Sequence, residues 1–218
     1  MNIVDLTYDI EEGMTTFHSE WHPEVVIEQL GTIPSAGRET RRISFGSHTG
    51  THMDAPLHFI ENGNSIEDLS LETLLGPVTV VDFTDFEENE AVTESRLQNV
   101  DLSPRMIFRF GWEDQWGDAE DFYFDYPYFT KDAAEYLVDQ GVQLMGFDTP
   151  SPDASHSEAD GSDEDSPVHK ILLGNDVVLV EYLKNLGKLD TKEGWMLAAL
   201  PMKVPGADGM PARVVAWK

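Results

Sequence analysis

The sequence of 218 residues contains no cysteine. This absence excludes disulfide bonds, thiolate zinc sites and cysteine nucleophiles. Basic residues are scarce too, with 14 Lys and Arg against 41 Asp and Glu and a formal net charge of -27. Because no basic patch is available to neutralise phosphates, we expect no nucleic-acid partner and no attachment to an anionic membrane.

Long apolar runs are also missing. No stretch of ~18 apolar residues occurs, so no transmembrane helix is expected. The first residues, MNIVDLTYDIEEG, lack the positive start and apolar core of a signal peptide. We therefore expect a cytoplasmic protein. The acidic residues are dispersed, which favours a solvated acidic surface of the halophilic type over a cation-binding cluster as the reason for their excess.

The chain does contain enough apolar material for a core. Hydrophobic residues make up 40% of it and aromatic residues 10%. Disordered chains are poor in such residues, so a folded protein is expected despite the charge. The length suits a single domain spanning residues 1–218.

Short runs rich in β-branched and aromatic residues, bounded by turn residues, predict strands. They span residues 3–6, 25–30, 40–45, 78–83, 106–110, 142–147, 177–182, 195–200 and 213–217. Helices are predicted at 66–75, at 131–140 and at 167–174, each behind a Ser or Thr suited to an N-terminal cap. Strands and helices do not alternate regularly. The predicted fold class is therefore α/β or α+β, with a mixed β-sheet core flanked by helices.

Three of the seven histidines fall within eleven residues, together with an aspartate. The four groups are His48, His52, Asp54 and His58. Gly50 and Pro56 argue against a helix here. In an extended chain all four even-numbered positions point to one side, but a straight strand would spread them over ~33 Å. Bends at Gly50 and at Ala55-Pro56 would gather them.

Neutral imidazoles with one carboxylate are ligands that zinc, manganese or iron accept. A lone histidine is most often structural, but three histidines and an aspartate in phase favour a metal site. The sequence contains neither an EF-hand loop nor an HExxH pair.

Residues 48–58, HTGTHMDAPLH, resemble the HxGTHxDxPxH signature of the metal-dependent cyclase family, which includes bacterial kynurenine formamidases and isatin hydrolases. The resemblance extends to residues 5–7 and the turn at 13–14, to 148–153, and to the stretch from 167–170 to 181–186, and so covers most of the chain. It implies a swivelling β/β/α fold and a homodimer or homotetramer.

The same resemblance implies roles for particular residues. His48, His52 and Asp54 correspond to metal ligands, and His58 to the residue that donates and accepts protons. In the two-metal members a later histidine and a glutamate twelve positions beyond it complete the site. His169 and Glu181 have this spacing, although an acid at a strand edge is also common in so acidic a chain. The implied cofactor is one or two divalent ions, zinc being favoured and manganese the alternative.

Aromatic residues are the candidates for substrate binding. Phe17 follows the turn at Gly13-Met14, where many family members carry a substrate-contacting Trp, and Trp21 and Phe59 are further candidates. Three other histidines have no assigned role and are expected at the surface or the pocket rim: His18, His22 and His156. The acidic segment 158–165 resembles an inserted loop of unknown role.

The activity implied by the resemblance is metal-dependent hydrolysis of a small amide C–N bond. His58 would take a proton from water and deliver it to the leaving nitrogen. An N-formyl arylamine is the favoured small-molecule substrate, and a cyclic amide of the isatin type is the alternative. A non-hydrolytic metalloenzyme and a metal-binding module without turnover remain open.

Overall fold

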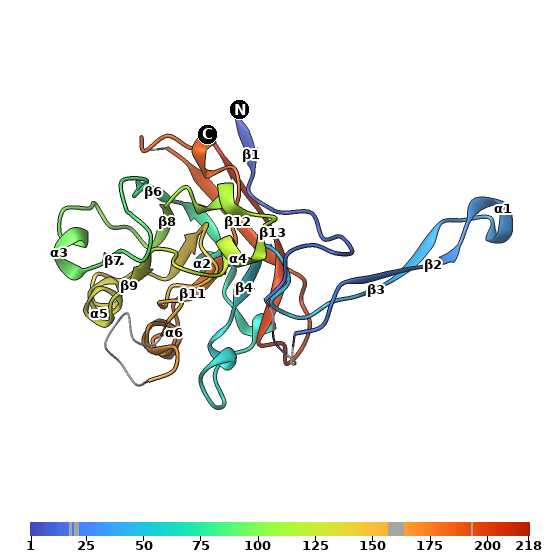
Figure 1. Cartoon of the computed structure of the whole chain (residues 1–218), viewed down its shortest axis with the longest axis horizontal. Coiled ribbons are helices and arrows are strands. Elements are labelled where there is room, and N and C mark those ends of the chain that lie inside the picture. The colour runs from blue at the N-terminus through green and yellow to red at the C-terminus, as the bar shows by residue number, and fades with distance from the viewer. Residues whose placement is uncertain (18, 20–21, 157–163, 193) are drawn as a thin grey trace.

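The computed structural model describes residues 1–17, 19, 22–156, 164–192 and 194–218. Its centre is a mixed nine-stranded sheet (Figure 1). In spatial order the strands are β5 (Leu75–Pro77), β12 (Met196–Pro201), β13 (Gly209–Trp217), β4 (His52–Asp54), β11 (Val178–Glu181), β10 (Leu144–Phe147), β8 (Arg105–Arg109) and β6 (Thr79–Asp82), while β1 (Ile3–Asp5) pairs with β13. Strands β6, β8, β10 and β11 are mutually parallel, and β4 runs antiparallel to both of its neighbours. The strand that carries His52 and Asp54 therefore lies where the parallel and antiparallel halves meet.

Helices and short turns pack around this sheet, apart from the first helix, which lies in a separate hairpin (Figure 1). The helices are α1 (Ile33–Ala36), α2 (Leu71–Leu74), α3 (Glu94–Leu97), α4 (Ala119–Phe122), α5 (Lys131–Asp139) and α6 (Pro167–Gly174). The 3-10 turns are η1 (Pro56–His58), η2 (Ile66–Asp68), η3 (Trp112–Gln115) and η4 (Leu186–Lys188). Two small sheets complete the fold: β2 (Val26–Gly31) with β3 (Thr40–Ser44), and β7 (Ala91–Val92) with β9 (Tyr128–Phe129). A mixed sheet flanked by helices confirms the predicted fold class.

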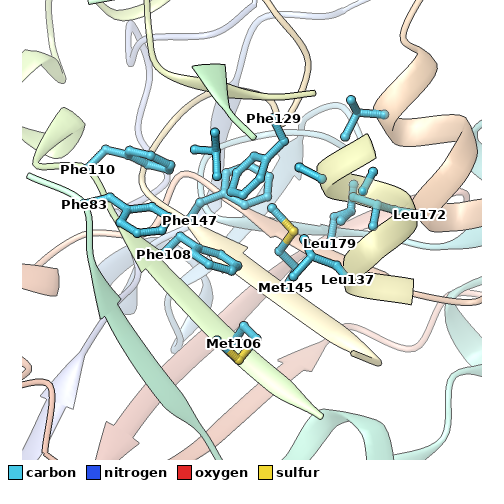
Figure 2. Close-up of a cluster of buried hydrophobic side chains, with 14 of the residues drawn as sticks. Phe83, Met106, Phe108, Phe110, Phe129, Leu137, Met145, Phe147, Leu172 and Leu179 are labelled. Carbon is cyan, nitrogen blue, oxygen red and sulfur yellow. The ribbon is translucent and has the colours of Figure 1, made fainter. Parts of the chain in front are cut away.

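The parallel strands are buried on both faces, because apolar side chains alternate between two cores. Phe108, Met145 and Leu179 point toward α5 and α6, where Figure 2 shows them with Leu137 and Leu172. Residues at the intervening positions, such as Ile107, Leu144 and Val180, belong to the other core. Parallel sheets covered on both sides have this near-continuous apolar pattern. The packing fixes the carboxyl end of β11, where Glu181 lies.

The predicted helices behind Thr130 and from Pro167 to Gly174 are present as α5 and α6. The single helix predicted at 66–75 is wrong, because this segment divides into η2, α2 and the start of β5. Ser65 and Asp68 do form the capping box, but it closes only one turn. Pairing of residues 75–77 with β12 then pulls the chain into the sheet.

The hairpin β2–α1–β3 extends away from the remainder of the molecule (Figure 1). Its two strands pair only with each other, in a sheet separate from the central one. Within the described ranges, the helices are all too short or too polar to cross a membrane.

Candidate metal centre

The backbone of residues 48–58 bends at the positions that the sequence predicts. Gly50 has a left-handed φ of 59°, which glycine adopts without strain. Residues 52–54 then form β4, and Pro56 begins η1, which ends at His58. Two bends around a three-residue strand thus bring the motif into a compact cluster.

Sheet register brings Glu181 to this cluster. In the antiparallel pair of β4 and β11, Glu181 lies directly opposite His52, and side chains of such pairs share a face. Asp54 lies two residues along β4, on the same face as His52. His169 reaches the cluster from α6. Residues separated by over a hundred positions therefore meet through ordinary strand pairing.

Asp54 lies at the centre of the cluster. Its Oδ1 is 2.7 Å from His48 Nδ1 and 3.4 Å from His52 Nε2, and its Oδ2 is 3.6 Å from His169 Nε2. Glu181 Oε2 is 3.4 Å from His52 Nε2, and Glu181 Oε1 is 3.3 Å from His169 Nε2. Potential ligand atoms fall into two groups that share Asp54. One group contains His48 and His58, and the other His52 and Glu181.

Several of these buried atoms lack hydrogen-bond partners among the residues described. They are His52 Nε2, both carboxylate oxygens of Asp54, and Glu181 Oε1. A buried polar atom without a partner costs about 1–3 kcal/mol, and more when it is charged. The lone pairs of these nitrogen and oxygen atoms point toward one another with no hydrogen-bond donor between them, and a bound cation would compensate for their burial. The arrangement therefore fits a divalent metal ion.

Each histidine ligand candidate is oriented through its second ring nitrogen. His52 Nδ1 donates to the carbonyl of Gly50 at 2.8 Å, and His169 Nδ1 donates to Asp153 at 2.6 Å. His48 Nε2 donates to Asp208 Oδ2 at 2.8 Å. In the neutral imidazoles that bind metal ions, these bonds would leave the lone pairs of His52 Nε2, His169 Nε2 and His48 Nδ1 directed at the carboxylates. Such outer hydrogen bonds are typical of metal-binding histidines.

Asp208 and Asp153 are functional candidates that the sequence did not identify. Asp208 Oδ2 also accepts from His58 Nδ1 at 3.2 Å, so one carboxylate holds two histidines. The Asp153 carboxylate accepts from the backbone N–H groups of Val168 and His169 as well, and so closes the start of α6. Asp153 lies in a segment that the resemblance covers, whereas nothing in the sequence marks Asp208.

The carboxyl groups of Asp54, Glu181 and Asp208 have shifted pKa values. Burial opposes ionisation of Asp54, but the neighbouring His48 imidazole outweighs it and holds the pKa well below its usual value. Burial, reinforced by the charge of Asp54, raises the pKa of Glu181. Hydrogen bonds from His48 and His58 hold the pKa of Asp208 well below its usual range. A cation between Asp54 and Glu181 would remove the repulsion between them.

A cavity of about 460 Å³ opens over the cluster. Its walls include the aromatic side chains Phe17, Phe59, Tyr123, Tyr126 and Tyr182. Phe17 makes an edge-on contact with Tyr123, with ring centroids 5.6 Å apart. A small aromatic molecule could therefore lie on these rings with a polar group directed at the ligand cluster.

The sequence of the chain matches the model of a known protein family. The Cyclase family model matches residues 4–154, well over half of the chain. The chain belongs to the Cyclase family. The matched range contains the 48–58 segment, including β4 and η1, which form part of that segment.

Individual relatives agree with this assignment. A kynurenine formamidase of Bacillus cereus (strain ATCC 10987) is 30% identical over 191 residues, which cover 86% of this chain and 82% of the relative. Isatin hydrolase A from Ralstonia solanacearum is structurally similar, with a TM-score of 0.86 and 27% identity over 99% of this chain and 91% of its own. A structure from Bacillus stearothermophilus described as a predicted metal-dependent hydrolase has a TM-score of 0.78 and 29% identity, covering 99% and 97% of the two chains.

In this Cyclase-family chain the structure brings together the six predicted site residues, and Phe17 lines the adjoining cavity. His156 lines the cavity at its exposed rim, as predicted. His22 lines it too but is buried, with its Nε2 3.0 Å from the carbonyl oxygen of His48. His18, Trp21 and residues 158–163 of the acidic segment lie outside the described residues. Glu164 and Asp165, which follow them, contribute to the cavity wall.

Proposed function

We propose that this chain is a metal-dependent hydrolase of small amide C–N bonds, with an N-formyl arylamine as its substrate. The observation that carries the proposal is the set of unpartnered acceptors of His52, Asp54 and Glu181 at the base of an aromatic cavity. The formamidase name of the Bacillus relatives supports the substrate class.

His48, His52, Asp54, His169 and Glu181 would hold the metal. A bound divalent ion polarises a carbonyl group and lowers the pKa of bound water toward ~7. Zinc is our proposal and manganese the alternative, because imidazole and carboxylate ligands suit both. Because the ligand atoms form two groups that share Asp54, we propose that the site holds one or two ions.

His58 would carry the protons. Its Nδ1 donates to Asp208, so its Nε2 is the unprotonated nitrogen that can act as a base. The proton taken from water at Nε2 would pass to the leaving nitrogen as the amide bond breaks. The carboxylate of Asp208 would stabilise the imidazolium between the two transfers. This reaction needs no nucleophilic side chain.

Aromatic walls would position the substrate. Phe17, Phe59 and Tyr123 offer ring surfaces against which an arylamine could stack or pack edge-on. A cyclic amide of the isatin type is the second candidate, supported by the similarity to isatin hydrolase A at a TM-score of 0.86. A panel of formanilides and isatin, assayed with zinc or manganese, would rank the two.

The His58→Ala variant tests the division of roles. Loss of a general acid and base lowers kcat by ~10²–10⁴-fold. We expect such a loss with most of the bound metal retained, measured by amide hydrolysis and by elemental analysis of the purified protein. His156→Ala, which removes an exposed histidine from the cavity rim, should leave both quantities unchanged.

Four outcomes would contradict this proposal. Activity that survives His58→Ala would remove His58 from proton transfer. Loss of the metal in that variant would make His58 a ligand, in line with its grouping with His48 and Asp54. Amide hydrolysis that persists after complete chelation would exclude a metal-dependent mechanism. Metal binding without turnover of any amide would favour a binding module.

A further inference from the structure

Three tyrosines line the cavity over the ligand cluster, and each is more than nine-tenths buried: Tyr123, Tyr126 and Tyr182. The Tyr126 hydroxyl is hydrogen-bonded to the side chain of Ser151. The Tyr123 hydroxyl is buried without a hydrogen-bond partner in the part of the chain that the structure describes. The Tyr182 hydroxyl lies near enough to affect the pKa of Tyr123, but it does not complete a hydrogen bond with it. Tyr123 therefore presents an unused polar group in the cavity wall.

This hydroxyl is a donor over the whole neutral pH range. Burial, reinforced by the charge of Glu181, raises the pKa of Tyr123 above its ordinary value. A hydroxyl that is buried without a partner destabilises the folded state, and such groups in native proteins commonly have a functional reason. An acceptor oxygen on a bound ligand would remove the cost. Tyr123 is therefore suited to recognise a ligand oxygen.

The position of Tyr123 indicates which ligand oxygen it meets. The ring of Tyr182 makes an edge-on contact with His52 in the ligand cluster, with centroids 5.1 Å apart. The ring of Tyr123 follows at 6.2 Å from Tyr182, and Phe17 lies 5.6 Å beyond on the outer wall. Tyr123 thus lies one ring farther from His52 than Tyr182 does. A substrate with its reacting carbonyl at the cluster would present a different oxygen to Tyr123.

Charge indicates that this oxygen is neutral. Among the residues that the structure describes, none of those lining the cavity is Lys or Arg. Glu164 and Asp165 contribute acidic side chains to the wall. The amino groups of Lys131 and Lys170 lie 3.4 and 3.7 Å from the Glu164 carboxylate, outside the lining. A carboxylate on the outer part of a substrate would meet acids there, whereas an uncharged acceptor suits a tyrosine hydroxyl.

We propose that Tyr123 determines specificity by donating a hydrogen bond to an uncharged carbonyl oxygen on the substrate's aromatic ring, separate from the carbonyl that is hydrolysed. This inference rests on the proposed amide hydrolysis, and it narrows the substrates to arylamides that carry a second, neutral acceptor. The bond forms equally in the ground state and the transition state. It therefore strengthens substrate binding without changing the chemical step.

Paired formanilides test this assignment. One compound of each pair carries an acetyl group and the other an isopropyl group of similar size, at each ring position in turn. We expect the wild type to prefer the acetyl compound at one or more positions. Tyr123→Phe should lower this preference by ~2–10-fold, the worth of one neutral hydrogen bond. The loss should fall on KM, with kcat retained.

Tyr126→Phe is the matched control, because it removes a hydroxyl of the same cavity that is already bonded within the protein. The acetyl preference should be unchanged in this variant. Urea unfolding without ligand gives a second readout. Because the Tyr123 hydroxyl has no internal partner to lose, we expect Tyr123→Phe to be at least as stable as the wild type.

Equilibrium binding separates this inference from the proposed activity. Acetylanilines and isopropylanilines lack the amide, so calorimetry measures their Kd without turnover. We expect the same acetyl preference, lost in Tyr123→Phe. This result with no hydrolysis of any formanilide would contradict the proposed function and still support the role of Tyr123.

Four results would overturn the assignment of Tyr123. They are a wild type without acetyl preference at any ring position, a preference that persists in Tyr123→Phe, and an equal loss of preference in Tyr126→Phe. The fourth is a loss in kcat rather than in KM, which would place the hydroxyl at the reacting carbonyl. A lower urea midpoint for Tyr123→Phe would likewise overturn it, by showing that the hydroxyl is bonded within the protein.

Discussion

Asp208 fixes two histidines through a single carboxylate oxygen, at 2.8 Å from His48 Nε2 and 3.2 Å from His58 Nδ1. Loss of a partner that orients a ligand typically costs ~10–100-fold in metal affinity or activity. Asp208→Asn keeps the size of the side chain but removes the charge that strengthens both bonds. We expect metal affinity and kcat to fall together by ~10–100-fold, measured by competition with a metal chelator and by steady-state kinetics.

Two matched variants separate this effect from a general loss of acidity. Of the histidines in the cluster, Asp153→Asn weakens the hold on His169 only, together with the contacts of Asp153 to the start of α6. It should therefore lower metal affinity with little further effect on kcat once the metal is saturating. Asp190→Asn removes a surface partner of Lys218 and should change neither quantity. If Asp208→Asn leaves kcat unchanged under saturating metal, Asp208 does not support His58.

The residues that the sequence identifies are those whose spacing is itself informative. His48, His52, Asp54 and His58 share a phase, and a bend at Gly50 is a local property of the chain. Asp208 lies 160 positions from His48, and only the pairing of β13 with β4 brings it close. The register between distant strands cannot be obtained from one sequence, so the contact of Asp208 with His48 could not be predicted.

At the scale of the elements, β13 begins at Gly209, directly opposite Asp54 in β4. A Cβ atom at Gly209 would lie 2.5 Å from Cε1 of His48. Gly209→Ala must therefore displace the imidazole from its position beside Asp54. We expect metal affinity to fall by at least the ~10–100-fold that loss of an orienting partner costs. Chelator competition measures this change, and circular dichroism should show an intact fold.

Gly174→Ala is the control for a glycine in a regular element. Its Cβ would lie 3.5 Å from Ile60, an ordinary contact, and alanine is favourable in a helix. Metal affinity should be unchanged in this variant. Equal losses in both variants, or none at Gly209→Ala, would mean that the position of His48 does not depend on the close approach of β13.

Asp148 joins the end of β10 to the loop after β8. Its buried carboxylate accepts from the backbone N–H groups of Phe110 and Gly111 at 2.9 and 2.8 Å. Burial raises its pKa from 3.8 to about 6. The folded state thus binds this proton more tightly than the unfolded chain, so its contribution to stability is present below pH ~4 and is lost as the pH rises through ~6.

This linkage predicts the pH dependence of Asp148→Asn. The amide does not ionise, so the free energy of unfolding of the variant, relative to wild type, should improve by up to about 3 kcal/mol between pH ~4 and ~7. Urea unfolding of both proteins across this range measures the difference. A difference that is constant, or that moves against the variant, would show that Asp148 ionises normally in the folded state.

Elements were predictable where their pattern is local. The nine predicted strand runs all overlap strands of the structure. Such runs can be recognised without knowledge of distant residues, because their β-branched composition and flanking turn residues are local features of the sequence. Residues 66–75 have helical spacing, yet β12 captures residues 75–77 as an added strand. The short strands β4, β7 and β9 carry two or three residues each, too few for any periodicity to be recognised.

At the scale of the whole molecule, we expect the net charge of -27 to affect the stability of the fold rather than catalysis. In the proposed site only Asp54 and Glu181 of the 41 acids would bind metal, and Asp153 and Asp208 would orient histidines. We propose that most of the remaining acids, Asp148 being buried, form a solvated surface whose like charges repel one another. This repulsion reaches ~10 Å at 0.1 M salt but only ~3 Å at 1 M, so salt should relieve it.

We therefore expect the melting temperature to rise from low to molar sodium chloride, by ~2–4 °C for each kcal/mol of repulsion that is screened. Differential scanning calorimetry measures the rise. A variant that neutralises three exposed acids, Glu88→Gln, Glu135→Gln and Asp139→Asn, should be more stable at low salt and gain less from added salt. A melting temperature of the wild type that does not depend on salt would contradict repulsion between the acidic residues of the surface. Equal gains in wild type and variant would trace the effect to apolar burial, which salt also strengthens.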